Sequence, residues 1–233
     1  DNFERFLAGA HAMDQHFYSA DFAKNMPVLM ALLGVWNINF LQYKTLAIMP
    51  YSDGLQLLPA YLQQLEMESN GKAAEHDTAP IIWGGVGCNG QHAYMQLLHQ
   101  GTQVVPVDFL VARRSINGPA ELQQLLVASC LGQSQALMAG KIAEADYKTC
   151  PGNRPSTTLM FDQLTPEAIG SLIALYEHKV FVQGVIWQIQ SFDQWGVQLG
   201  KELIKDVLNL MENSQQAQAI DSSTAGLLDY FKV

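Results

Sequence analysis

Residues 81–98 read IIWGGVGCNGQHAYMQLL, and this stretch decides the fold class. The apolar run Ile81-Ile82-Trp83 is typical of a buried strand, a glycine-rich loop follows it directly, and a helical pattern continues to Leu98. Glycines allow a tight turn from a strand into a helix. Because the loop lacks both the lysine-serine ending of a P-loop and the GxGxxG spacing, the sequence favours a strand-to-helix turn over a nucleotide site.

The same alternation continues on both sides of this stretch. Apolar runs predict strands, and patterns of helical period predict helices between them. The strands are expected at residues 45–49, 103–111 and 157–161, and the helices at 55–67, 119–142 and 166–185. Strands that alternate with helices indicate an α/β fold, a three-layer αβα sandwich with a mostly parallel sheet, and ligands are expected beyond the carboxyl ends of its strands.

Helical patterns also occupy both ends of the chain. Residues 2–17 and 22–42 predict two helices that pack as a hairpin, and the glutamine-rich patch 213–218 predicts a linker before a last helix at 225–231. The predicted division has three parts: a helical lead-in at 1–44, an α/β domain at 45–190 and a helical tail at 191–233.

Composition restricts the kind of protein. The chain has 233 residues, 48% of them hydrophobic, which is enough to bury a full core. A formal charge of −9 argues against nucleic acid or an anionic membrane surface as partner, and the apolar runs are too short to span a bilayer. Three widely spaced cysteines indicate neither a disulfide framework nor a zinc site and favour a reducing cytoplasm. The chain starts at Asp1, inside a predicted helix, so we expect it to be a piece of a longer protein.

Residues 184–201, GVIWQIQSFDQWGVQLGK, change from an apolar run to a polar, aromatic stretch and then to a helical pattern. Gln194 and Lys201 are seven residues apart, so on a continuous helix they would share a face. A carboxamide and an ammonium could then point into one pocket. The alternative is an amphipathic helix with a solvated lysine.

Two further side chains are candidates for proton transfer. Glu68 falls at the end of a predicted helix before a Ser-Asn-Gly turn, and His92 is expected in the first turn of the helix after the glycine loop. The alternatives are a solvated helix end with Gly71 as its left-handed cap, and a structural histidine. The six histidines include no pair at ligand spacing on one helix face, so no metal site is predicted.

Six blocks of sequence resemble the glucose-6-phosphate isomerase (phosphoglucose isomerase) family, in its C-terminal portion. They occur in the family's order and cover nearly the whole chain. The blocks are MESNGK at 67–72, NGQHAYMQLLHQGT at 89–102, PGNRPS at 151–156, ALYEHKVFVQGV at 174–185, FDQWGVQLGK at 192–201 and DSSTAGL at 221–227. The resemblance implies a flavodoxin-like sugar isomerase domain followed by a helical tail.

The resemblance also implies a reaction and the residues that carry it. The family interconverts glucose 6-phosphate and fructose 6-phosphate through a cis-enediol, with no metal or other cofactor. On this basis Glu68 is the base that moves a proton between carbons 1 and 2, His92 assists ring opening in the pocket of the partner subunit, and Lys201 also acts in ring opening. Gln64 and Gln194 are implied substrate contacts, and the intact protein is implied to be a homodimer.

The chain departs from the family in two respects. The family usually shows GEPGTNGQH, whereas Gly85, Val86 and Cys88 here replace the glutamate, proline and threonine, and the segment from Glu68 to His92 is short. Family members are also much longer, and the part that this chain lacks would bind the substrate phosphate. The isolated chain is therefore expected to be nearly inactive, and the alternative function is a non-catalytic sugar-phosphate-binding or interaction module of the same fold.

Overall fold

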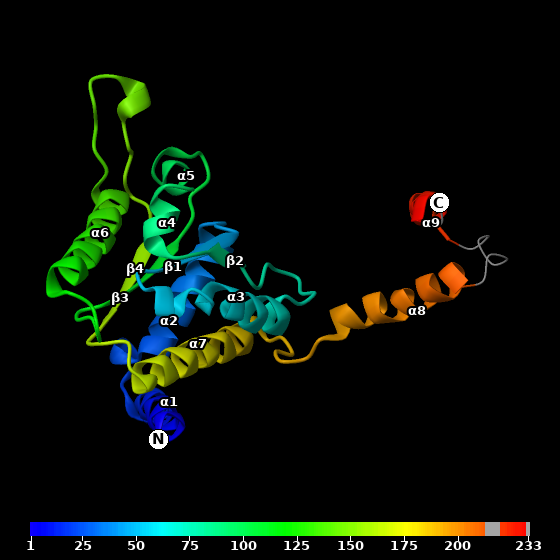
Figure 1. The fold of residues 1–233 in the computed structure, drawn as a ribbon, viewed down its shortest axis with the longest axis horizontal. Helices are drawn as coiled ribbons and strands as arrows, with labels where there is room; N and C mark the ends of the chain where they lie inside the picture. Colours follow the sequence, from blue (N-terminus) through cyan, green and yellow to red (C-terminus); the bar gives the residue numbers. More distant parts are fainter. Residues whose placement is uncertain (213–219, 232–233) are drawn as a thin grey trace. The chain divides into compact units, whose positions relative to one another are not determined.

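The structure, a computed structural model, describes residues 1–212 and 220–231. At its centre is a four-stranded parallel sheet in the order β2-β1-β3-β4 (Figure 1). The strands are β1 (Thr45–Pro50), β2 (Ile81–Gly84), β3 (Val107–Ala112) and β4 (Ser156–Phe161). All four predicted strands are confirmed. β3 starts later than predicted, directly after Pro106, because proline has no amide hydrogen to donate to a neighbouring strand.

Side chains of the strands alternate between two apolar layers. On β3, Val107, Phe109 and Val111 are buried on one face of the sheet, and Leu110 is buried on the other. The first face is covered by α4 (Gly87–Gln91), α5 (Met95–Gln100) and α6 (Ala120–Ala139); the second by α2 (Met26–Val35), α3 (Leu58–Leu62) and α7 (Pro166–Trp187). The predicted three-layer sandwich is confirmed.

The N-terminal helices are held by α7. The Thr165 hydroxyl caps α7, since it accepts a hydrogen bond from the Ala168 amide. α1 (Asn2–Ser19) and α2 each pack mainly against α7, so the predicted hairpin between them is wrong. The α1–α7 approach is close because Gly9 and Gly170 lie in the contact, where a Cβ on either would come within about 2 Å of a backbone oxygen of the other helix.

The predicted helix at 22–42 is interrupted. A 3₁₀ turn (Phe22–Lys24) precedes α2, and a wide π-helical turn, η2 (Trp36–Phe40), follows it. Asn25 separates the first two pieces, since its side chain accepts from the Val28 amide at the start of α2 and donates to the Phe17 carbonyl. The apolar pattern is continuous through this cap, which is why the break was not predicted.

The chain forms two compact units, Asp1–Phe192 and Asp193–Val233. The second contains a 3₁₀ turn, η6 (Trp195–Val197), and helices α8 (Gln198–Glu212) and α9 (Ser222–Phe231). The predicted linker at 213–218 lies outside the described residues, and the division at residues 44 and 190 stays a prediction. Across residues 1–212 and 220–231, no helix combines the length and apolar character needed to cross a membrane.

Candidate functional site

Glu68 ends a helical segment that follows β1, here called the Glu68 segment (residues 58–70). It begins as α3 and continues as a wide π-helical turn, η4 (Gln63–Glu68), so the predicted helix is confirmed from Leu58 onward, with a wider turn in its second half. Short π-helical turns are uncommon and occur often at functional sites.

Hydrogen bonds hold the Glu68 segment against its neighbours. On the side of β2, Gln63 Nε2 donates to the Ile82 carbonyl at 3.1 Å, and the Ile82 amide donates to Met67 Sδ at 3.4 Å. On the side of α7, Asn70 Nδ2 donates to the Val180 carbonyl at 3.0 Å. The segment is therefore fixed to the sheet and to a long helix at once.

Gln64 and Glu68 are turned away from these anchors. Gln64 is exposed and Glu68 is half-buried, and Gln64 Nε2 donates to Glu68 Oε2 at 3.2 Å. The structure thus brings together the predicted base and one predicted substrate contact. Gly71 follows without the positive φ of a left-handed cap; it is required because a Cβ there would lie 2.2 Å from the Met67 carbonyl oxygen.

His92 lies elsewhere in the fold. It is exposed and follows the last turn of α4, so its predicted place in the first turn of a helix is wrong. Gly84 has a φ of +131°, which turns the chain at the carboxyl end of β2, and Gly87 lets the loop pack on the Tyr51 ring. His92 is therefore at the carboxyl edge of the sheet.

Glu68 belongs to the opposite edge. Its segment starts beyond the carboxyl end of β1 and runs back along the sheet until Met67 meets Ile82 near the amino end of β2. Within one chain the structure does not bring Glu68 and His92 together. Ligands were expected beyond the carboxyl ends of the strands. Of Glu68 and His92, only His92 lies there.

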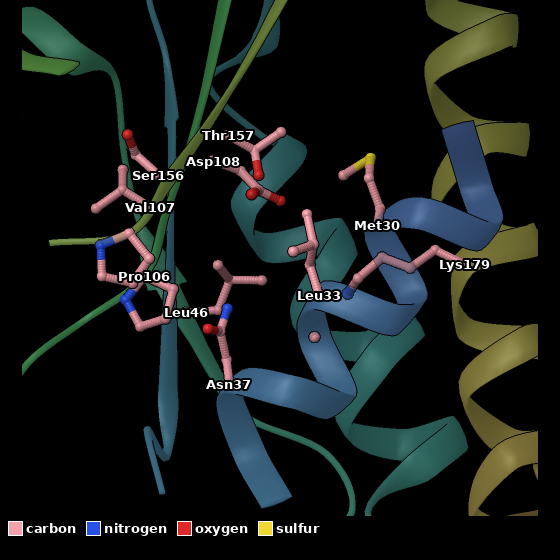
Figure 2. Close-up of a pocket in the computed structure, with 12 residues that line it drawn as sticks. Met30, Leu33, Asn37, Leu46, Pro106, Val107, Asp108, Ser156, Thr157 and Lys179 are labelled. Carbon is pink, nitrogen blue, oxygen red and sulfur yellow. The ribbon is translucent and has the colours of Figure 1, made fainter. Parts of the chain in front are cut away.

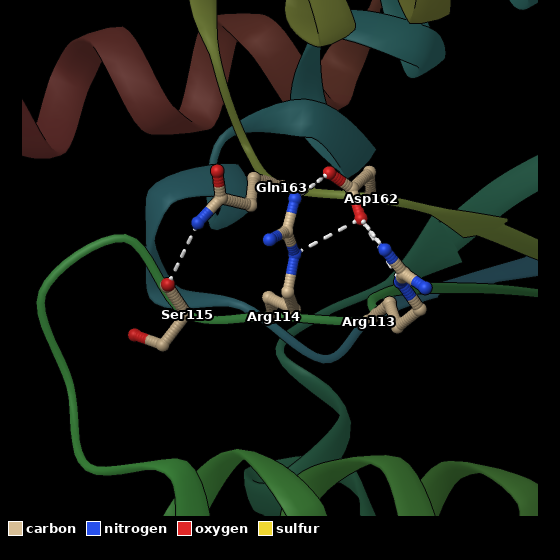
Figure 3. Close-up of polar contacts among 5 residues, drawn as sticks. All are labelled: Arg113, Arg114, Ser115, Asp162 and Gln163. Atoms are coloured by element: carbon tan, nitrogen blue, oxygen red, sulfur yellow. Dashed lines mark hydrogen bonds and ion pairs between the residues drawn. The ribbon is translucent and has the colours of Figure 1, made fainter.

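At the carboxyl edge, two strands are joined by ion pairs that sequence reasoning missed (Figure 3). Arg113 and Arg114 follow β3, and both guanidinium groups bond to Asp162, which follows β4. Gln163 Nε2 donates to the Ser115 carbonyl at 3.0 Å. Hydrogen bonds from Arg114 and Arg113 lower the pKa of Asp162. A sequence signal was available, since charged residues lie within two or three positions after two predicted strands.

A second missed cluster is buried beside a cavity between α2 and the amino ends of β1, β3 and β4 (Figure 2). Asp108 and Lys179 both line this cavity. Tyr176 donates its hydroxyl to Asp108 Oδ2 at 3.1 Å, and Lys179 Nζ donates to Glu66 Oε2 at 2.7 Å. Burial raises the pKa of Asp108 despite the nearby Lys179 charge. Charged residues inside otherwise apolar runs were the sequence signal here.

The second unit carries the remaining predicted residues, Gln194 and Lys201. Both are exposed. α8 starts at Gln198, so Gln194 precedes the helix and the predicted shared helical face is wrong. Among the residues that the structure describes, no three His, Cys, Asp or Glu side chains are arranged to hold a metal ion.

Comparisons with known proteins agree with the resemblance. The phosphoglucose isomerase family profile matches residues 1–228. Glucose-6-phosphate isomerases from Pseudomonas fluorescens and Pseudomonas putida (strain GB-1) are each 52% identical over 99% of the chain. These alignments extend over 257 residues, so the relatives have internal residues that this chain lacks. The chain spans 46% of each relative's length.

Solved structures give the same result. The crystal structure of a glucose-6-phosphate isomerase from Chlamydia trachomatis matches 99% of this chain and 46% of that one, with a TM-score of 0.88 and 42% identity. A hypothetical protein from Thermus thermophilus matches with a TM-score of 0.74 over 88% of this chain and 50% of that one, and at 23% identity it supports the fold alone. The chain therefore belongs to the phosphoglucose isomerase family.

Proposed function

We propose that this chain supplies the base of an aldose–ketose isomerase site that interconverts glucose 6-phosphate and fructose 6-phosphate. The observation that carries the proposal is the Gln64–Glu68 pair. In a segment whose neighbouring side chains anchor it to β2 and α7, these two face outward and touch each other at 3.2 Å. A carboxylate held next to a carboxamide suits proton transfer on a bound polyhydroxy substrate.

The proposed reaction needs no net gain or loss of electrons. Glu68 takes the proton from carbon 2 of the open-chain aldose while the carbon 1 carbonyl oxygen gains a proton, which gives the cis-enediol. Loss of the proton on the carbon 2 hydroxyl and return of a proton from Glu68 to carbon 1 give the ketose. Gln64, which donates to Glu68 Oε2, orients the carboxylate and extends toward the substrate hydroxyls.

Ring opening is assigned to groups outside the Glu68 segment. We propose that His92 and Lys201 move protons between the ring oxygen and the carbon 1 hydroxyl, and that Gln194 contacts the substrate. The position of His92 at the edge of the sheet opposite Glu68 supports its action in a second subunit's pocket, and hence a homodimer. A cytoplasmic location, favoured by the cysteine content, is part of the same proposal.

The test uses a hybrid enzyme, in which this chain replaces the matching segment of the Pseudomonas fluorescens relative. We expect the 233-residue chain alone to be nearly inactive and the hybrid to convert glucose 6-phosphate in a coupled assay. Glu68→Gln should lower kcat of the hybrid by about 10³-fold with little change in KM, because a carboxamide cannot accept the proton. Glu75→Gln, an exposed carboxylate change nearby in sequence, is the control and should have no effect.

Two results would contradict the proposal. Full activity of the hybrid with Glu68→Gln would remove the base assignment. A hybrid that binds glucose 6-phosphate but never converts it would instead support the non-catalytic sugar-phosphate-binding module.

A further inference from the structure

The Glu68 segment has one anchor of a different kind, a buried ion pair. Glu66, inside the wide turn η4, pairs with Lys179 on α7 at 2.7 Å, and each side chain is only 3% exposed. The Arg5–Glu167 pair between α1 and α7, in contrast, has side chains that are 49% and 40% exposed. The Glu66–Lys179 pair is thus removed from water, and its Glu66 lies in the same turn as the predicted base, Glu68.

A buried ion pair often adds little to the free energy of unfolding. The loss of hydration of both ions can exceed their mutual attraction, and well-packed apolar residues often serve the fold equally well. What such a pair does provide is a specific partner, because either charge left alone in the core is strongly unfavourable. Glu66 is therefore confined to the one place where it meets the Lys179 ammonium.

The surroundings of Lys179 reinforce this pairing. Asp108 is the other buried carboxyl group near it, and Tyr176, one turn earlier on α7, donates to Asp108 at 3.1 Å. Burial raises the pKa of Asp108 and so favours its neutral form. Lys179 Nζ itself donates to Glu66 Oε2 at hydrogen-bonding distance.

The location of Glu66 matters because the turn is wide. A π-helical turn holds one residue more than an α-helical turn, and relaxation to an α-helix would shift each later residue by about 100° and 1.5 Å. Glu68 is only two residues beyond Glu66, so such a shift would rotate and move its carboxylate relative to the start of the segment, where Gln63 is anchored to β2. A fixed Glu66 prevents it.

We propose that Lys179 is a positioning residue for the predicted base: through Glu66 it holds the wide turn Gln63–Glu68 in the register that sets where the Glu68 carboxylate lies relative to β2. This inference rests on the proposed function for its catalytic consequence. Its structural part, the register of the turn, can be tested in the 233-residue chain by itself.

The main variant is the double change Glu66→Leu with Lys179→Met. It removes both charges of the pair together, so neither is left without the other, and we expect the melting temperature to stay near or above that of the parent. Hydrogen exchange should become at least about tenfold faster at Ser69 and Gly71, whose amides bond to the Glu66 and Met67 carbonyls. In the hybrid enzyme, kcat should fall at least about tenfold with KM changed by less than about threefold, as for a misplaced base.

The matched control removes a surface pair, Arg5→Met with Glu167→Leu, and should change neither exchange at Ser69 and Gly71 nor kcat. A second variant exchanges the charges, Glu66→Lys with Lys179→Glu. It keeps an ion pair between the same positions. If Lys179 has the proposed positioning role, the hydrogen-exchange rates at Ser69 and Gly71 and kcat should recover to within about fivefold of the parent values.

The outcomes separate the two proposals. If the double variant folds with unchanged exchange and unchanged kcat, or if the charge-exchanged variant folds without recovery, the positioning role is overturned. If the unaltered hybrid shows no isomerase activity, the proposed function fails, while the exchange measurements on the chain alone still decide whether Lys179 sets the register of the turn.

Discussion

Two glutamates, two residues apart, have opposite surroundings in this chain. Glu66 is buried against Lys179, whereas Glu68 is half-buried beside Gln64. In the sequence QLEMESNGK, the predicted helix end made Glu68 a candidate for proton transfer, and the family resemblance implied its role as the base. The structure supplies a physical difference, because the Glu66 carboxylate is buried in an ion pair and the Glu68 carboxylate is partly exposed.

A buried amide side chain on α7 allows the cost of burying an unpaired polar group to be measured. Gln183 is fully buried, and within the described part of the chain neither of its amide atoms has a hydrogen-bond partner. Because an unpaired buried amide is costly, Gln183→Met should raise the free energy of unfolding by about 1 kcal/mol. Chemical denaturation measures this.

The matched control is Gln123→Met on α6. Gln123 is also buried, but its Nε2 donates to the Ala112 carbonyl at 2.6 Å, so this change should destabilise the chain by about 1 kcal/mol. Equal destabilisation by both substitutions would show that the Gln183 amide is bonded in solution and would contradict the prediction.

Strands were easier to predict than helices in this chain. The run at Ile81 and the other three strands are short, apolar and bounded by proline or glycine, so their sequence pattern and their environment agree. Periodicity reports which face of a helix is apolar but not whether a turn holds an extra residue, so the wide turns at Gln63–Glu68 and Trp36–Phe40 were not predictable. The position of Glu68 at a helix end made it a candidate, the resemblance implied its role, and the hydrogen bonds that anchor its segment came from the structure alone.

An element-scale prediction concerns the central strand β3, whose Asp108 is buried. Burial raises its folded-state pKa above the ordinary 3.8. As pH rises past that ordinary value, the unfolded chain releases a proton that the folded chain retains. The contribution of Asp108 to the free energy of unfolding is therefore at its full value below about pH 3.8. Above that pH it falls, by about 1.4 kcal/mol per pH unit, until the folded-state pKa is reached.

Asp108→Asn should remove this decline, since an amide does not titrate and still accepts from Tyr176. Urea unfolding at pH 4, 5, 6 and 7 should show nearly equal stability at pH 4 and a growing advantage of the variant at higher pH. A constant difference between the two proteins across this range would show that Asp108 ionises in the folded chain as it does in water.

At the scale of the whole molecule, the parallel sheet separates the predicted acid and base groups. His92 follows the carboxyl end of β2, and Glu68 lies where its helix returns to the amino end of β2. No change of side-chain rotamer brings opposite edges of a sheet together. The proposed pocket with both groups therefore combines two copies of the chain, and this proposal can be tested by mixing subunits.

Subunit mixing gives different results for the two arrangements. Hybrid enzymes with Glu68→Gln and with His92→Ala should each be inactive. When they are unfolded and refolded together, a shared pocket gives every mixed dimer one intact site, so random pairing should restore about a quarter of the unaltered activity. If both groups served the same chain's pocket, each mixed dimer would have two damaged sites and no activity would return. The control pairs Glu75→Gln with Glu68→Gln, each carrying a different affinity tag, and its purified mixed dimers should have about half the unaltered activity in either arrangement, since one site stays intact.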